Sequence, residues 1–162
     1  MTAPALVMVG MGSTDAQVAQ VAHSLRQGLQ RMRAGLSVHC AFLEHCSPTP
    51  AQVVGQLVKQ GITEIAATPH FYASQYSPQK FLERRAACAA RLQEALTPDL
   101  PHVYLGAEVC YFDGVSRIDE LEALWIQNTS ILLLEMPFAK WSRRMVNEVA
   151  EIQNRRDTQV LL

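Results

Sequence analysis

Residues 6–35 read LVMVGMGSTDAQVAQVAHSLRQGLQRMRAG and decide the fold class of the chain. Residues 6–10 form an apolar run of a length typical of a buried strand, and a glycine-containing turn follows. Apolar residues then recur every three or four positions over residues 14–34, which predicts an amphipathic helix that ends at Gly35. The predicted inward face of this helix consists of Val18, Val21, Ala22, Leu25, Leu29 and Met32. A buried strand followed by such a helix is a β/α unit of a parallel sheet.

The rest of the chain repeats this alternation. Further strands are predicted at residues 37–43, 62–68, 103–109, 131–136 and 159–162. Thr49-Pro50, Ser77-Pro78 and Ser142 are predicted to begin helices, because Ser and Thr cap helix N-termini and Pro fits the first turn. A short helix is predicted at residues 117–125, and the apolar face of the helix after Ser77 extends to Leu96. The pattern predicts a mostly parallel α/β sheet with right-handed crossovers.

The composition limits the classes of function. The chain has 162 residues, 49% of them hydrophobic, which fits a single domain over residues 1–162. Its net charge of −1 gives no positive excess for nucleic acid or anionic lipid, so we expect neither as a partner. The apolar runs are too short to span a bilayer. A secretory signal begins with positive charges, whereas no Lys or Arg precedes Arg26 here. We therefore expect a cytoplasmic protein whose four cysteines are reduced.

The first candidate site follows the first two predicted strands. Ligands of open parallel sheets bind at the carboxyl ends of the strands. Gly10, Met11, Gly12 and Ser13 occupy that place after the first strand, and Glu44 occupies it after the second. Two glycines allow close approach of the backbone, and the free N–H groups of the helix start attract anions. The alternative is a plain tight turn with Ser13 or Thr14 as the N-cap.

The second candidate site follows the third, fourth and fifth predicted strands. His70, Glu108 and Glu135 lie at or near the carboxyl ends of these strands and would meet at one edge if the strands are neighbours. One imidazole and two carboxylates are suitable ligands for a divalent metal such as Mn, Zn or Co. The alternative is a capping histidine with solvated carboxylates. We expect no other cofactor.

Residues 4–65 resemble the start of a class II chelatase, the sirohydrochlorin and cobalt-inserting family. The matching phrases are LVMVGMGSTDAQVAQVAHSLRQGL and LSVHCAFLEHCSPTPAQVVGQLVKQGITEI. The family has V-G-H-G-S at the first turn, and Met11 takes the place of its metal-handling histidine here. A thioether cannot take a proton. The resemblance implies an open flavodoxin-like sheet in which strand one lies between strands two and three.

The chain from about residue 61 onward resembles a different family, the bacterial capsule-type tyrosine phosphatases of the polymerase-and-histidinol-phosphatase group. The matching phrases are GITEIAATPHFY, SPQKFLERRAACAARLQEAL, VYLGAEVCYFDG and ILLLEMPFAKWSRRMVNEVAEIQ. The resemblance implies that His70 and Glu108 match two ligands of a multinuclear metal site. The H-x-H motif that begins this family, and the A-H-x-E-R phrase that follows later, are absent from the sequence.

Together the two resemblances suggest a recombined chain. We expect an engineered or recombined chimera, chelatase-like over residues 1–62 and phosphatase-like over residues 63–162, that ends flush on its sixth strand. The expected fold is an open, doubly wound, flavodoxin-like sheet of strand order 2-1-3-4-5-6, and the alternative is a half-barrel that dimerises through its edges.

Three functional hypotheses follow from this interpretation. The first is a chain without native catalytic activity, because both parental sites are incomplete. The second is a residual site for a divalent metal or an anion with weak phosphatase-type activity. The third is a divergent tetrapyrrole chelatase or tetrapyrrole-binding protein. In each case an exposed sheet edge favours a homodimer.

Overall fold

The computed structural model describes residues 4–95, 97, 100–155 and 158–162. The chain divides into two compact units, Met1–Thr63 and Glu64–Leu162, and each unit is described by itself. None of the helices in the described ranges is long and apolar enough to cross a membrane.

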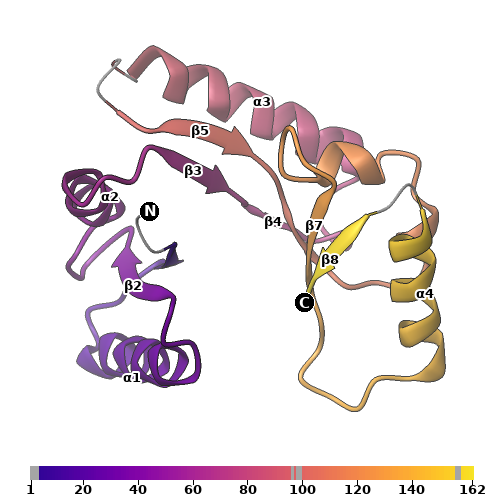
Figure 1. Ribbon diagram of the computed structural model, residues 1–162, viewed down its shortest axis with the longest axis horizontal. Helices are drawn as coiled ribbons and strands as arrows, with labels where there is room; N and C mark the ends of the chain where they lie inside the picture. Colours follow the sequence, from indigo (N-terminus) through magenta and orange to yellow (C-terminus); the bar gives the residue numbers. More distant parts are fainter. Residues whose placement is uncertain (1–3, 96, 98–99, 156–157) are drawn as a thin grey trace. The chain divides into compact units, whose positions relative to one another are not determined.

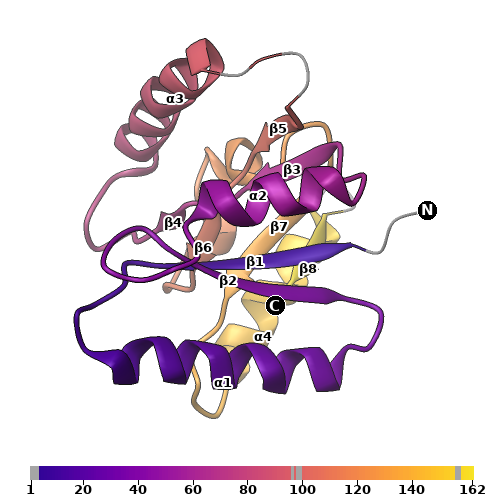
Figure 2. The same cartoon turned by 90° about the vertical axis from the view of Figure 1, so that its left-hand side faces the viewer.

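The first unit is a two-stranded parallel sheet with a helix on each face. Strands β1 (Ala5–Gly10) and β2 (Ser37–Phe42) pair in parallel over their full length. Helix α1 (Ala16–Met32) lies on one face and helix α2 (Pro50–Lys59) on the other (Figure 2). Alternate residues of a strand point to opposite faces, so β2 contributes to both layers of packing.

Helix α2 begins and packs as the sequence predicts. The Thr49 side chain accepts a hydrogen bond from the Gln52 backbone N–H, and the Gln52 side chain accepts one from Thr49 N in return. This reciprocal pair satisfies two N–H groups that would otherwise lack partners. Val53 and Leu57 are buried against Ala41 of β2 and form the small core of this unit.

Helix α1 contacts β2 with only part of its predicted face. Val21 and Met32 are 68% and 79% exposed. Ala22, which belongs to the predicted face, accepts a hydrogen bond from the Cys40 thiol at its carbonyl, at 3.3 Å. Gln30, which does not belong to it, accepts a hydrogen bond from the Val38 backbone N–H at Oε1, at 2.8 Å. Gln30 also donates to the Leu36 carbonyl at 2.6 Å, so its amide satisfies two backbone groups at the start of β2.

The second unit contains two parallel sheets. One pairs β3 (Glu64–Ala67) with β5 (His102–Leu105). The other has the order β4-β6-β7-β8, in which β4 is His70–Phe71, β6 is Glu108–Cys110, β7 is Ile131–Glu135 and β8 is Gln159–Leu161.

The two sheets join through a bent ribbon. The predicted strand 103–109 is split into β5 and β6. The predicted strand 62–68 ends at Ala67, and a second short strand, β4, follows it. Two hydrogen bonds cross the break, from Gly106 N to the Ala67 carbonyl at 2.9 Å and from Glu108 N to the Pro69 carbonyl at 3.0 Å. Pro69 has no N–H to donate, which weakens the ladder at this point.

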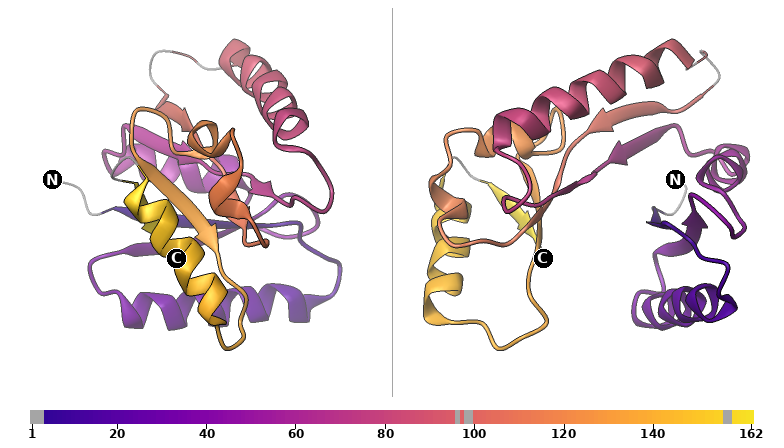
Figure 3. Two further views of the ribbon diagram at one scale, coloured as in Figure 1. Left: turned by 90° about the vertical axis from the view of Figure 1, so that its right-hand side faces the viewer. Right: turned by 180° about the vertical axis from the view of Figure 1, so that it is seen from behind.

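Helices α3 (Pro78–Ala95) and α4 (Arg143–Asn154) belong to the second unit. Helix α3 lies between β4 and β5 in the order of the chain (Figure 1), and its predicted apolar residue Leu96 lies outside the described residues. Helix α4 packs over β7 and β8 (Figure 3). Two short 3-10 turns, η1 (Val115–Arg117) and η2 (Leu121–Leu124), replace the predicted helix 117–125.

The core of the second unit lies between its four-stranded sheet and the surrounding helices and turns. Its fully buried residues include Phe71, Val109, Val115, Leu121, Leu124, Leu132, Leu134 and Ile152. Arg85 fastens α3 to this unit, because its guanidinium donates to the carbonyls of Gly106 and Ala123, both at 2.8 Å. Burial lowers the pKa of this guanidinium.

The structure confirms the predicted α/β class with parallel strands. Strand pairing within the units also follows the predicted order, 2-1 in the first and 3-4-5-6 in the second, when the split strands are counted as one each. The predicted pairing of strands one and three would join the two units and stays a prediction.

Candidate functional site

The first predicted site is a pair of hydrogen-bonded loops in the first unit. Gly10 is the last residue of β1, and its carbonyl accepts Leu43 N at 3.0 Å. The carbonyl of Met11 accepts Glu44 N at 2.8 Å. The Cys46 thiol donates to the Ser13 carbonyl at 3.1 Å. The two loops therefore hold each other in a fixed arrangement.

The polar groups of these loops are already engaged. The Ser13 hydroxyl accepts a hydrogen bond from Asp15 N at 3.0 Å, and Asp15, rather than Ser13 or Thr14, caps α1. The Glu44 Oε2 atom lies 3.5 Å from the Nε2 atom of His45. The Met11 side chain is 62% exposed. This part of the chain offers an exposed thioether and a capped helix start, with no base at position 11.

The second predicted site lies on the outer face of the four-stranded sheet. His70 of β4 lies opposite Glu108 of β6 in the parallel ladder. The Nδ1 atom of His70 is 3.1 Å from the Glu108 Oε2 atom. The two side chains are 50% and 33% exposed, so a ligand from solvent can reach them. The predicted meeting of an imidazole and a carboxylate is therefore present.

The third predicted residue has a different partner. Glu135 of β7 lies opposite Cys110 of β6, and the two side chains share a hydrogen bond. Burial, followed by the charge of Glu135 and this hydrogen bond, raises the pKa of the Cys110 thiol. Glu108 and Cys110 are two residues apart on β6, a spacing of about 7 Å along a strand. The two pairs thus lie side by side.

Tyr72 adds a phenol to this face. Its ring centroid is 5.4 Å from that of His70. Burial, followed by the neighbouring acids Glu135, Cys110 and Glu108, raises the pKa of the Tyr72 phenol. We call His70, Tyr72, Glu108, Cys110 and Glu135 the strand-end cluster. Because the pairs are offset, no three His, Cys, Asp or Glu side chains within the described ranges are placed to hold one metal ion.

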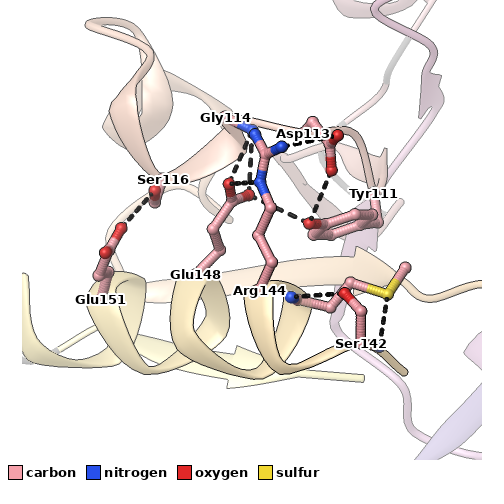
Figure 4. A network of polar contacts seen from close by, with 9 residues as sticks. Tyr111, Asp113, Gly114, Ser116, Ser142, Arg144, Glu148 and Glu151 are labelled. Carbon is pink, nitrogen blue, oxygen red and sulfur yellow. Dashed lines mark hydrogen bonds and ion pairs between the residues drawn. The ribbon is translucent and has the colours of Figure 1, made fainter. Parts of the chain in front are cut away.

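A separate polar network fastens α4 to the loop before η1 (Figure 4). Glu148 is only 5% exposed, and both of its carboxylate oxygens accept Gly114 N at 3.0 Å. The Tyr111 hydroxyl donates to the same carboxylate at 3.2 Å, and Arg144 Nε donates to it at 3.3 Å. Arg144 also pairs with Asp113 at 3.0 Å. This network positions the start of α4.

Two residues of the strand-end cluster were not singled out from the sequence. Tyr72 and Cys110 each lie two positions beyond a predicted site residue, on the same side of an extended chain. The alternation of a strand was therefore the signal that could have found them, because Phe71 and Val109 between them are apolar and fully buried.

Comparison with protein families gives one match. The family model CbiX matches residues 5–127. Neither the curated proteins nor the solved structures gave a match.

The extent of this match gives no support to the chimera interpretation. It spans residues 61–68, where a joint between two ancestries was expected, and it includes His70 and Glu108. The phosphatase resemblance of residues 61–162 has no support in the comparisons, and neither has an engineered origin. The resemblance to class II chelatases holds, and it extends well beyond residue 65. Since the match covers most of the sequence, the chain belongs to the CbiX family of chelatase-like proteins.

Proposed function

We propose that this protein binds a tetrapyrrole and promotes insertion of a divalent metal ion such as cobalt, with His70 as the group that accepts protons. The observation that carries the proposal is the His70–Glu108 pair at 3.1 Å, which lies one residue before the carboxyl end of β4 and two before that of β6, within the part of the chain that matches CbiX. Open parallel sheets bind their ligands at the carboxyl ends of their strands.

Metal insertion requires a base. A divalent ion enters the macrocycle as two pyrrole N–H groups lose their protons, so two protons leave for each ion bound. Glu108 engages Nδ1 of His70 and orients the ring, and no hydrogen bond reaches Nε2 in the part of the chain that the structure describes. Nε2 is therefore the atom that takes each proton in turn and passes it to water.

Met11 has no part in proton transfer under this proposal. Its sulfur cannot accept a proton at ordinary pH, and a thioether binds soft ions better than borderline divalent ions. A protein that relies on one imidazole, without a second at the first turn, is expected to insert metal slowly. Its main property is then binding of the tetrapyrrole.

The test is a spectrophotometric titration with sirohydrochlorin and Co²⁺. The wild-type protein should shift the absorption bands of the tetrapyrrole and then convert them to those of the cobalt complex faster than buffer does. His70→Ala should lower the insertion rate at least tenfold, a typical loss for a general base. His102→Ala is the matched control, because His102 is an exposed histidine at the amino end of β5.

Two outcomes contradict the proposal. If the wild-type protein neither binds sirohydrochlorin nor accelerates insertion, the interpretation as an inactive chain is favoured. If His70→Ala and His102→Ala insert cobalt equally fast, the base lies elsewhere. A phosphatase assay with Mn²⁺ on the same preparation tests the remaining hypothesis from the sequence, and we expect no turnover.

A further inference from the structure

The segment that follows Glu135 combines exposed aromatic rings with cations. Phe138 is fully exposed and Trp141 is 39% exposed, and Lys140 lies between them. An exposed aromatic ring offers a large, flat apolar surface that a ligand can cover. The segment connects the carboxyl end of β7 to α4, so it begins directly beside the strand-end cluster. Phe138 is three residues from Glu135, within about 10 Å along the chain.

A hollow of about 400 Å³ adjoins this segment at the start of α4. It is lined by Arg117, Arg143, Arg144, Asn147, Glu148 and Glu151. Each guanidinium group can bind a carboxylate through two parallel hydrogen bonds, and three of them lie around this hollow.

Some of the charged side chains that line the hollow already have partners within the protein. Arg144 is held by Asp113 and Glu148 (Figure 4). Glu148 is satisfied by Gly114 N and Tyr111, and Glu151 accepts the Ser116 hydroxyl at 2.8 Å.

The two remaining arginines are uncommitted. No ion pair or hydrogen bond holds the Arg117 or Arg143 side chain in the described ranges, and both are exposed. Arg117 Nη2 is 3.6 Å from the position that a Cβ on Gly114 would take, which places its guanidinium over the loop that binds Glu148. The carboxylates of the hollow therefore have partners already, while two guanidinium groups are left for a ligand.

We infer that the hollow and the segment of residues 136–142 together bind the carboxylate-bearing edge of a tetrapyrrole. Arg117 and Arg143 bind the carboxylates, and the rings of Phe138 and Trp141 pack on the flat apolar macrocycle. This inference rests on the proposed function and assigns the groups that recognise its substrate. A phosphate ion would use the two arginines but not the rings, so the exposed aromatics favour a flat organic polycarboxylate.

The test compares two water-soluble porphyrins by titration and quenching of tryptophan fluorescence. Uroporphyrin carries eight carboxylates, and tetra(N-methylpyridyl)porphyrin carries cations and none. The wild-type protein should bind uroporphyrin, more weakly as ionic strength rises, and bind the cationic porphyrin poorly. Replacing both Arg117 and Arg143 by Gln should weaken uroporphyrin binding at least tenfold, since a charge-assisted hydrogen bond contributes about that much. Arg31→Gln, an exposed arginine of α1, is the matched control.

A second variant tests the rings. Phe138→Ala should weaken uroporphyrin binding several-fold while the salt dependence stays unchanged. If the wild-type protein binds uroporphyrin and both the arginine and the Phe138 variants bind it equally well, this inference is wrong and the proposed function stands. If the wild-type protein binds neither uroporphyrin nor sirohydrochlorin, both are wrong.

Discussion

Gly12 has a backbone conformation that other residues rarely adopt. Its φ is +88°, and a Cβ built on it would lie 1.9 Å from the Glu44 carbonyl oxygen. The glycine thus lets the two loops of the first unit approach closely enough for the Glu44–Met11 hydrogen bond. Gly28, in the middle of α1, has nothing within 4 Å of such a Cβ.

We expect Gly12→Ala to lower the free energy of unfolding of the first unit by about 2–4 kcal/mol, because backbone strain and a steric clash add. Gly28→Ala is the control and should raise stability by roughly 0.5–1 kcal/mol through higher helix propensity. Urea unfolding followed by far-UV circular dichroism measures both. Equal stabilities of the two variants would show that the Gly12 turn relaxes without cost.

Tyr111 gives the second unit a stability that depends on pH. Burial, followed by the charge of Glu148 and the hydrogen bond to it, raises the pKa of Tyr111 to about 12. In the unfolded chain the phenol titrates near pH 10. A proton held more tightly in the folded state stabilises it fully below about pH 10, and this contribution is lost as the pH rises towards 12.

Tyr111→Phe should therefore lower the free energy of unfolding by about 1 kcal/mol near neutral pH, the usual cost of one hydrogen bond. The difference between wild type and variant should stay constant below about pH 10 and shrink as the pH rises towards 12. Urea unfolding monitored by tryptophan fluorescence at each pH measures it. A difference that does not change with pH would contradict the assignment to Tyr111.

At the scale of elements, α4 depends on one buried carboxylate for its attachment to the loop before η1. Glu148 accepts hydrogen bonds from Gly114 N, Tyr111 and Arg144. Glu148→Gln should cost about 2 kcal/mol, because the amide can accept fewer of these bonds and leaves Arg144 without its buried partner. The exposed Glu151, one turn away on α4, provides the control: Glu151→Gln should cost less than about 1 kcal/mol. Thermal unfolding of both variants measures the difference.

The elements also show what the sequence can predict. The His70–Glu108 pair was predictable, because both residues follow apolar runs and parallel strands align their carboxyl ends. The orientation of α1 was not, because apolar periodicity carries no information on the bond from Gln30 to β2. A sequence pattern also assigns a helical glutamate to solvent, so it could not identify Glu148 as buried.

Strand breaks are a second limit of the sequence analysis. Gly106 interrupts the predicted strand 103–109, and Pro69 separates β3 from the unpredicted strand β4. The surroundings of Gly106 are tight, because a Cβ there would lie 3.1 Å from the side chains of Ile126 and Thr68, closer than an ordinary van der Waals contact. Ile126 is far from Gly106 in the chain, and such a long-range contact cannot be deduced from local periodicity.

At the scale of the molecule, the division into two units predicts two unfolding transitions. Both tryptophans of the chain, Trp125 and Trp141, belong to the second unit, whereas helix content is shared by both. Tryptophan fluorescence should therefore report the second unit alone, with a urea midpoint different from that of far-UV circular dichroism. Gly12→Ala should shift the circular dichroism curve only. Coincident curves for the wild type would show that the units unfold together.

The predicted homodimer belongs to the same scale and stays a prediction. Strand β8 pairs with β7 on one side, and Leu161 on it is 49% exposed. Light scattering after gel filtration measures the mass of the wild type and of Leu161→Lys. A dimer that the lysine dissociates would support association through this edge, and a monomeric wild type would contradict it.

The two hydrogen bonds that attach α3 through Arg85 predict which exchange at this position would weaken the attachment in related chains. The Arg85 guanidinium donates to the main-chain oxygens of Gly106 and Ala123 at the same time. No other side chain has a rigid, planar group with donors placed to do this. A relative with lysine at position 85 keeps the charge and loses one of the two attachments. In an alignment of such relatives, the exchange of Arg for Lys at this column would signal a loosened helix, although tables of similarity score it as conservative.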